Sequence, residues 1–129
     1  MSPAEKLVQV LLGLRMTGPK SGVVDELHKP ENALMHQKSI AGAIMNLTPI
    51  LKDIVEEGIK AGCFSTPYPE QSIRILLAAG LTLTDEGMFS FTQEEQAQLL
   101  HALVYACETL LGAKKGSFAS GLQEFMKRI

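Results

Sequence analysis

Histidine and cysteine are the side chains of this sequence best suited to bind a metal or act as a nucleophile. His28 and His36 are eight residues apart with Pro30 between them, so they lack the i, i+4 spacing by which one helix face offers two imidazoles to a metal. Cys63 and Cys107 are 44 positions apart without a CxxC pair, and we expect both to be small core residues. The serines carry no GxSxG elbow. We therefore expect no metal site, no cofactor and no enzymatic activity.

The run from Gly13 to Ser21 is partly similar to the G-x4-G-K-S loop that binds phosphates through backbone N–H groups and a lysine. Pro19 stands between the glycine and the lysine and removes a backbone donor, and the run follows a helical pattern where the motif requires a strand. The formal charge is −2, from 12 basic and 14 acidic residues, and no basic cluster exceeds two residues. We expect neither nucleotide binding nor direct contact of this chain with nucleic acid.

A ridge of small and polar side chains is the best candidate for a binding surface. Met35, Ser39, Gly42, Asn46 and Pro49 follow one another at spacings of four, three, four and three, so they share one helix face. Small-molecule pockets are mostly apolar with a few polar groups, and methionine adapts to varied shapes. The ridge either walls such a pocket or allows a neighbouring helix to approach closely. The candidate ligand-binding residues, including weaker additions near the ridge, are Met16, His28, Met35, His36, Ser39 and Asn46.

Helical periodicity runs through most of the chain and predicts an all-α fold, a bundle of five or six helices. Ser2 is the expected N-cap of the first helix, and Pro49 is expected to kink the long one. Only Met88–Phe91 has the composition of a short strand. The expected helices cover residues 3–16, 23–28 and 31–61, a segment from Pro69 or Glu70, a segment opened by the capping box Thr92–Glu95, and a last segment from Phe118.

Two of these helices are apolar around more of their circumference than one small core can cover. Residues 73–83 are interrupted only by Arg74 and Thr82, and residues 99–111 carry a similarly broad stripe. We expect a homodimer in which these helices form a four-helix contact between two copies. The alternative is that both helices are central in a monomeric bundle. The expected interface residues are Leu76, Ala79, Leu83, Leu99, Leu103, Ala106 and Leu110.

The composition is that of one folded domain, with 46% apolar and 20% charged residues. The longest uncharged stretch, Ser39–Leu51, has 13 residues. A bilayer span needs about 20 apolar residues, so we expect no membrane contact. The first residues lack a basic region followed by an apolar run, which predicts a cytoplasmic protein.

A resemblance to a known family rests on three segments: Leu27–Asn32, Met35–Ser39 and Pro49–Phe64, the last continued by Tyr68–Glu70. They resemble the C-terminal regulatory domain of TetR-family transcriptional regulators. In that family an E-E-G-x-x-x-G-x-F segment ends the long central helix, and a proline shortly afterwards opens the first of two dimerisation helices. The matching residues here are Glu56, Glu57, Gly58, Gly62, Phe64 and Pro69.

The resemblance implies that residues 1–129 form one ligand-binding and dimerisation domain. Pro3 already begins what resembles the first helix of the regulatory core, so the family's helix-turn-helix reader is expected to be absent from this chain. The implied partners are a second copy and an unknown small-molecule effector, which shifts the population of bundle arrangements and, in an intact regulator, alters DNA binding. The alternative function is a helical dimeric protein-interaction module without a ligand pocket.

Overall fold

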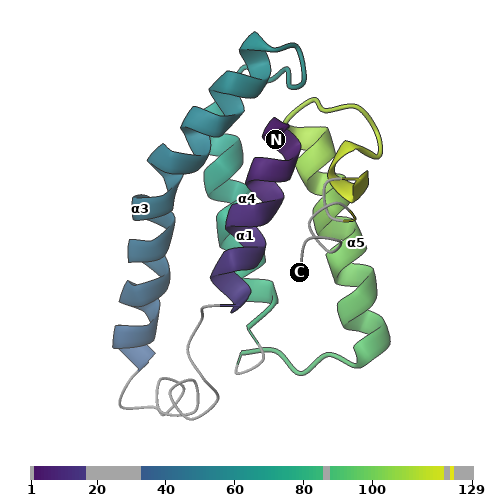
Figure 1. Ribbon diagram of the computed structural model, residues 1–129. Helices are drawn as coiled ribbons and strands as arrows, with labels where there is room; N and C mark the ends of the chain where they lie inside the picture. The colour runs from purple at the N-terminus through teal and green to yellow at the C-terminus, as the bar shows by residue number, and fades with distance from the viewer. Residues whose placement is uncertain (1, 17–32, 86–87, 121–122, 124–129) are drawn as a thin grey trace.

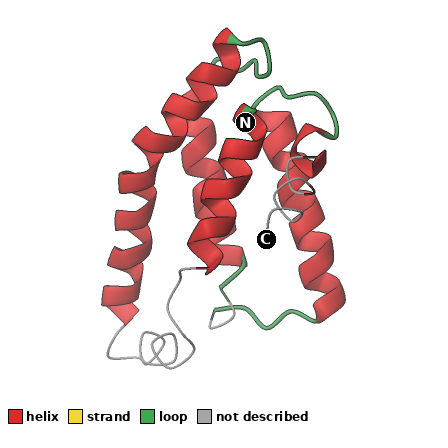
Figure 2. Ribbon diagram, viewed as in Figure 1, coloured by secondary structure: helices red, strands yellow, loops and turns green. Residues whose placement is uncertain are grey.

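The computed structural model describes residues 2–16, 33–85, 88–120 and 123 of the chain. Figure 2 shows helices joined by loops, without a strand in these ranges, so the all-α prediction is confirmed and Met88–Phe91 is not a strand. The helix expected over residues 23–28 lies outside the described residues. The labelled helices are α1 (Pro3–Met16), α3 (Ala33–Lys60), α4 (Pro69–Leu83) and α5 (Gln93–Leu110), and residues 117–120 form a further helical turn.

Three helices begin where the sequence predicts. The hydroxyl of Ser2 accepts the backbone N–H of Glu5 at 3.1 Å, which caps α1. α4 begins with Pro69, because the missing N–H costs nothing at the first helical position. Thr92 and Glu95 form the reciprocal capping box of α5, in which the backbone N–H of each donates to the side chain of the other at 3.0 and 3.1 Å. Side-chain capping therefore marks the starts of α1 and α5, and a proline at the first helical position marks the start of α4.

The long helix α3 has 28 residues and continues through Pro49. Proline has no N–H, so the carbonyl of Met45 loses its usual helical partner. The buried Thr48 hydroxyl donates to the carbonyl of Ile44 at 2.6 Å and adds a side-chain hydrogen bond in the same turn. Figure 1 shows α3 changing direction along its course, in keeping with the predicted kink.

The end of α3 is shaped by two glycines with different roles. Gly62 has a φ of +80°, a left-handed conformation that glycine adopts without strain. The N–H groups of Cys63 and Phe64 donate to the carbonyl of Gly58 at 2.7 and 3.2 Å, which satisfies the helix end. Gly58 itself lies inside the helix, where the ring of Phe64 occupies the space that a Cβ would need. The chain therefore reverses sharply and directs Phe64 into the core.

The core lies where α3 packs on α4 and α1. Figure 1 shows α1 in front of α4, with α3 on one side and α5 on the other. Phe64 stacks on Phe118 with ring centroids 5.8 Å apart, which ties the C-terminal helical turn to the end of α3. The largest fully buried side chains are Leu7, Leu51, Val55, Leu77 and Leu111.

Candidate functional site

A half-open hollow of about 240 Å³ lies between the end of α4, the loop after it and the start of α5. Its described lining residues are Leu83, Thr84, Asp85, Phe89, Phe91, Gln93, Gln96, Ala97, Leu99 and Leu100. Aromatic and aliphatic groups form most of this surface, and two amides, one hydroxyl and one carboxylate supply polar contacts. This mixture is typical of a site for a small organic molecule.

The hollow is shaped by how α4 stops. The hydroxyl of Thr84 donates to the carbonyl of Gly80, and the N–H of Asp85 donates to the carbonyl of Thr82 at 3.2 Å. The carbonyl of Asp85 in turn accepts the N–H groups of Met88 and Phe89, each at 3.0 Å. These bonds hold the Asp85 side chain and the start of the aromatic loop at one end of the helix.

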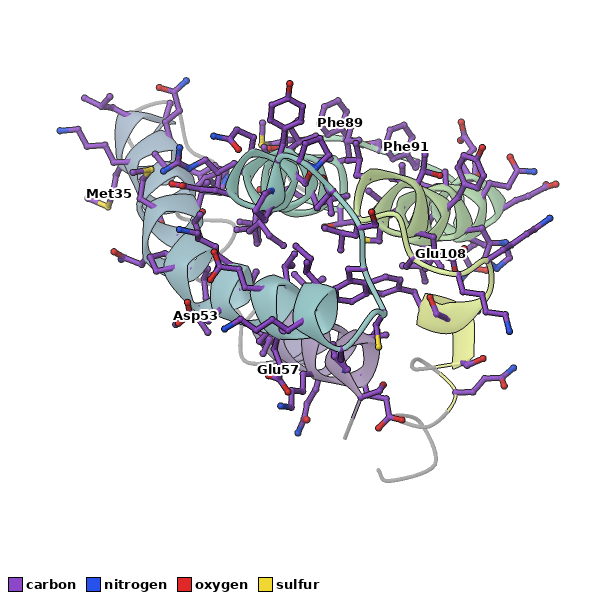
Figure 3. The ribbon with its side chains drawn as sticks, turned by 90° about the horizontal axis from the view of Figure 1, so that it is seen from above. Met35, Asp53, Glu57, Phe89, Phe91 and Glu108 are labelled. Carbon is purple, nitrogen blue, oxygen red and sulfur yellow. The ribbon has the colours of Figure 1, made fainter. Side chains whose placement is uncertain are left out.

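Two aromatic rings form one wall of the hollow. Phe89 and Phe91 stack with centroids 5.5 Å apart and ring planes 3° from parallel. Figure 3 shows the two rings side by side, on the side of α4 and α5 that faces away from α1. The amide of Gln96 donates to the carbonyl of Phe91 at 3.4 Å, which connects the loop to the first turns of α5.

One hydrogen-bonded contact joins the hollow to α3. The Nε2 of His36, in the first turn of α3, lies 2.8 Å from Oδ2 of Asp85, and the two side chains are only 17% and 12% exposed. His36 is one of the weaker ligand candidates, and nothing in the sequence pairs it with Asp85, because the two residues are 49 positions apart, one on α3 and the other in the loop after α4. Only the packing of α3 on α4 brings them together.

The other predicted ligand residues lie elsewhere. Met35 is 60% exposed and points away from the bundle in Figure 3, and Ser39 and Asn46 are also exposed on α3. None of these three is among the described residues that line the hollow. Met16 ends α1 but its side chain is outside the description, and His28 lies outside the described residues altogether.

The expected dimer residues lie mostly at an incompletely covered surface. Leu76 is the exception, because only 8% of it is exposed and it belongs to the core of the single chain. The other six are half-buried, namely Ala79, Leu83, Leu99, Leu103, Ala106 and Leu110. Sequence reasoning did not single out Ile75, Leu100 and Tyr105 as interface residues, although they are 57%, 36% and 67% exposed. Ile75 and Leu100 lie within the predicted apolar stripes, and this position is the sequence feature that could have identified them as interface residues.

The two cysteines lie in different surroundings, and only Cys107 agrees with the expectation from the sequence. Burial raises the pKa of the Cys107 thiol to about 11, and the neighbouring Glu108 carboxylate adds to the effect, so this cysteine remains a protonated packing residue, as expected. Cys63 is exposed, and its assignment to the core was wrong, because it follows the sharp turn at Gly62.

A buried carboxylate holds the C-terminal turn. Oε1 of Glu108 accepts the N–H groups of Gly116 and Phe118 at 3.0 and 3.3 Å. Figure 3 shows this side chain directed towards that turn. The sequence does not predict this role, because the spacing of residues in α5 does not indicate which backbone N–H groups of a later segment will lie near Glu108.

Within the described ranges, no three histidine, cysteine, aspartate or glutamate side chains gather closely enough to hold a metal ion. Every described helix is too short or too polar to cross a bilayer.

A model of a known protein family matches most of the chain. The family model described as "Tetracyclin repressor-like, C-terminal domain" matches residues 16–118. This range includes α3, α4 and α5, the hollow and the His36–Asp85 pair. No curated protein matches the sequence.

Proposed function

The chain belongs to the tetracyclin repressor-like C-terminal domain family, and from this premise we propose that it is the effector-binding and dimerisation domain of a TetR-like transcriptional regulator. Domains of this family are regulatory, and they generally dimerise and bind small-molecule effectors. The proposal for this chain is a homodimer, formed through α4 and α5, whose arrangement responds to a bound small molecule.

The observation that carries the proposal is the apolar surface that α4 and α5 leave uncovered. Ile75 on α4 is 57% exposed, and Tyr105 on α5 is 67% exposed. Half-buried leucines and alanines lie along the same two helices. A surface of this kind gains free energy when a second copy removes it from water, by about 25 cal/mol for each Å² of apolar area.

Ile75→Glu tests the dimer. The side chain is largely exposed in the single chain, so the substitution leaves the core intact, whereas in a dimer it buries an unpaired charge. A penalty of about 3 kcal/mol weakens dimerisation more than a hundredfold. We expect light scattering to report a dimer for the wild type and a monomer for Ile75→Glu, with unchanged helical circular dichroism.

Ala41→Glu is the matched control, because it adds the same charge at an exposed position of α3. It is expected to remain dimeric. Leu103→Glu is also expected to give monomer or aggregate, but Leu103 is half-buried and the substitution disturbs the chain itself. A monomeric wild type, or a dimeric Ile75→Glu, contradicts the assignment of this surface.

Effector binding is tested by a thermal-shift screen of apolar, cationic and anionic metabolites with the full chain. A ligand that binds the folded state raises the apparent stability by mass action, by about 2.7 kcal/mol at a hundred times its Kd. At least one compound is expected to raise the Tm in a concentration-dependent way. A dimer that no compound stabilises supports the interaction module without a pocket.

A further inference from the structure

We propose that the hollow between α4 and α5 binds a small organic cation with an aromatic ring, using Asp85 as counter-ion and Phe89 and Phe91 as the aromatic wall, and that the cation competes with His36 for Asp85. This inference rests on the proposed function and gives it a ligand class and a route to α3.

The charge of the hollow favours a cation. Asp85 is the only ionisable residue among the described lining residues, and its side chain is 12% exposed. The C-terminus of α4 carries the negative end of the helix dipole, and its last turn holds no basic residue. The positive end of α5 is offset by Glu94 and Glu95 in its first turn. An anion would therefore meet repulsion at the place where a cation meets its counter-charge.

The shape and lining favour an aromatic body on that cation. A hollow of about 240 Å³ exceeds the apolar cavity of about 150 Å³ that holds benzene in an engineered protein, so a ring with a short amine chain fits. The stacked Phe89 and Phe91 rings offer aromatic contact and cation–π attraction. Gln93 and Gln96 line the same hollow and offer amide groups to orient the ligand.

Competition for Asp85 connects the hollow to α3. The 2.8 Å contact from His36 is made to the carboxylate that a bound ammonium would also contact. A bound cation weakens the contact between His36 and Asp85, and this contact in turn weakens binding of the cation. The cation therefore binds more tightly to the arrangement in which the contact is broken, which is the difference in affinity that a population shift requires. Removing the histidine side chain removes one hydrogen bond to Asp85 that competes with the cation. For a hydrogen bond of ordinary strength, cation binding becomes about two- to twelvefold tighter.

The test uses three indole compounds of different charge with the full chain, and their binding is followed by calorimetry. Tryptamine is cationic, tryptophol neutral and indole-3-propionate anionic. We expect tryptamine to bind at least tenfold more tightly than tryptophol, and indole-3-propionate to bind most weakly. Asp85→Asn is expected to abolish the preference for tryptamine over tryptophol, and His36→Ala to tighten tryptamine binding.

Two further variants separate recognition from folding. Gln93→Lys introduces a positive charge at an exposed position of the lining, so it should weaken tryptamine at least tenfold and strengthen indole-3-propionate while leaving the Tm unchanged. Asn46→Leu, on the exposed ridge of α3, should leave the affinities unchanged.

Three outcomes overturn the inference: equal affinity for tryptamine and tryptophol, cation binding that survives both Asp85→Asn and Gln93→Lys, or no binding by tryptamine and one-ring arylalkylamines at millimolar concentration. If an uncharged or anionic compound nevertheless stabilises the dimer in the screen, the proposed function stands and only this ligand assignment fails.

Discussion

Replacing Gly58 with alanine should destabilise the protein although alanine is the better helix former. A Cβ at this position overlaps the Cγ, Cδ2 and Cε2 atoms of the Phe64 ring. That ring is 3% exposed and stacked on Phe118 at 5.8 Å, so it has no free volume into which to move. The added methyl group therefore has two opposite effects on stability: overpacking of the core destabilises the fold, and the higher helix propensity of alanine stabilises it.

The magnitude follows from the two terms. Overpacking of a well-packed core costs about 1 to 3 kcal/mol, and overlap with three ring carbons places Gly58→Ala at the upper end. The gain in helix propensity returns about 1 kcal/mol. The net loss is about 2 kcal/mol, which lowers the Tm of a domain of this size by about 6 to 10 °C.

The assay is thermal and urea unfolding followed by circular dichroism, with Gly42→Ala as the control. Gly42 lies on the same helix, and a Cβ there meets nothing within 4 Å, so this substitution should raise stability by about 0.5 to 1 kcal/mol. Phe64→Leu, which removes the ring, should reduce the cost of Gly58→Ala in the double variant. If Gly58→Ala proves as stable as Gly42→Ala, the packing argument is refuted.

Three further predictions concern groups on and around α5. Cys63 is exposed and the pKa of Cys107 is raised to about 11, so Ellman's reagent at pH 8 should titrate one fast thiol per chain, and Cys63→Ser should remove it. The backbone N–H of Thr92 donates to the Glu95 carboxylate and lowers its pKa. This carboxylate therefore stabilises the fold at pH values above its ordinary pKa and loses that contribution as the pH falls. Glu95→Gln should lower the urea midpoint at pH 7 but not at pH 3, and an equal loss at both pH values would contradict this. Glu108→Ala leaves two N–H groups without their acceptor and should cost about 2 kcal/mol or more in urea unfolding, whereas Glu108→Gln, which keeps an acceptor oxygen, should cost less than half of that.

The sequence predicts those parts of the fold that depend on neighbours along the chain. Ser2, Pro69 and Thr92 mark helix starts because each acts on backbone groups within three or four residues. The helical period likewise decides which residues share a face, and the buried Leu51 and Val55 of the long helix, four positions apart, lie on one side of it.

The contacts of the candidate site depend instead on packing between distant segments. Periodicity places Met35 and Asn46 on one ridge, but it does not say which face of the helix a neighbouring helix covers, and the structure leaves these two residues exposed. The pairing of His36 with Asp85 requires the positions of α3 and α4 to be known beforehand. A hollow between the end of one helix and the start of the next has no periodic signal at all.

The distribution of burial along α3 gives the His36–Asp85 pair its importance. The buried residues of α3 are Thr48, Leu51, Val55 and Gly58, all in its second half, which the core therefore holds in place. In the first half no residue is buried, and the His36–Asp85 contact joins this half to the loop that follows α4. Pro49 interrupts the backbone hydrogen bonds between the two halves. A ligand that draws Asp85 away from His36 thus acts on the half of the helix that contributes no fully buried residue to the core, which is the arrangement that a conformational response of small energetic cost requires.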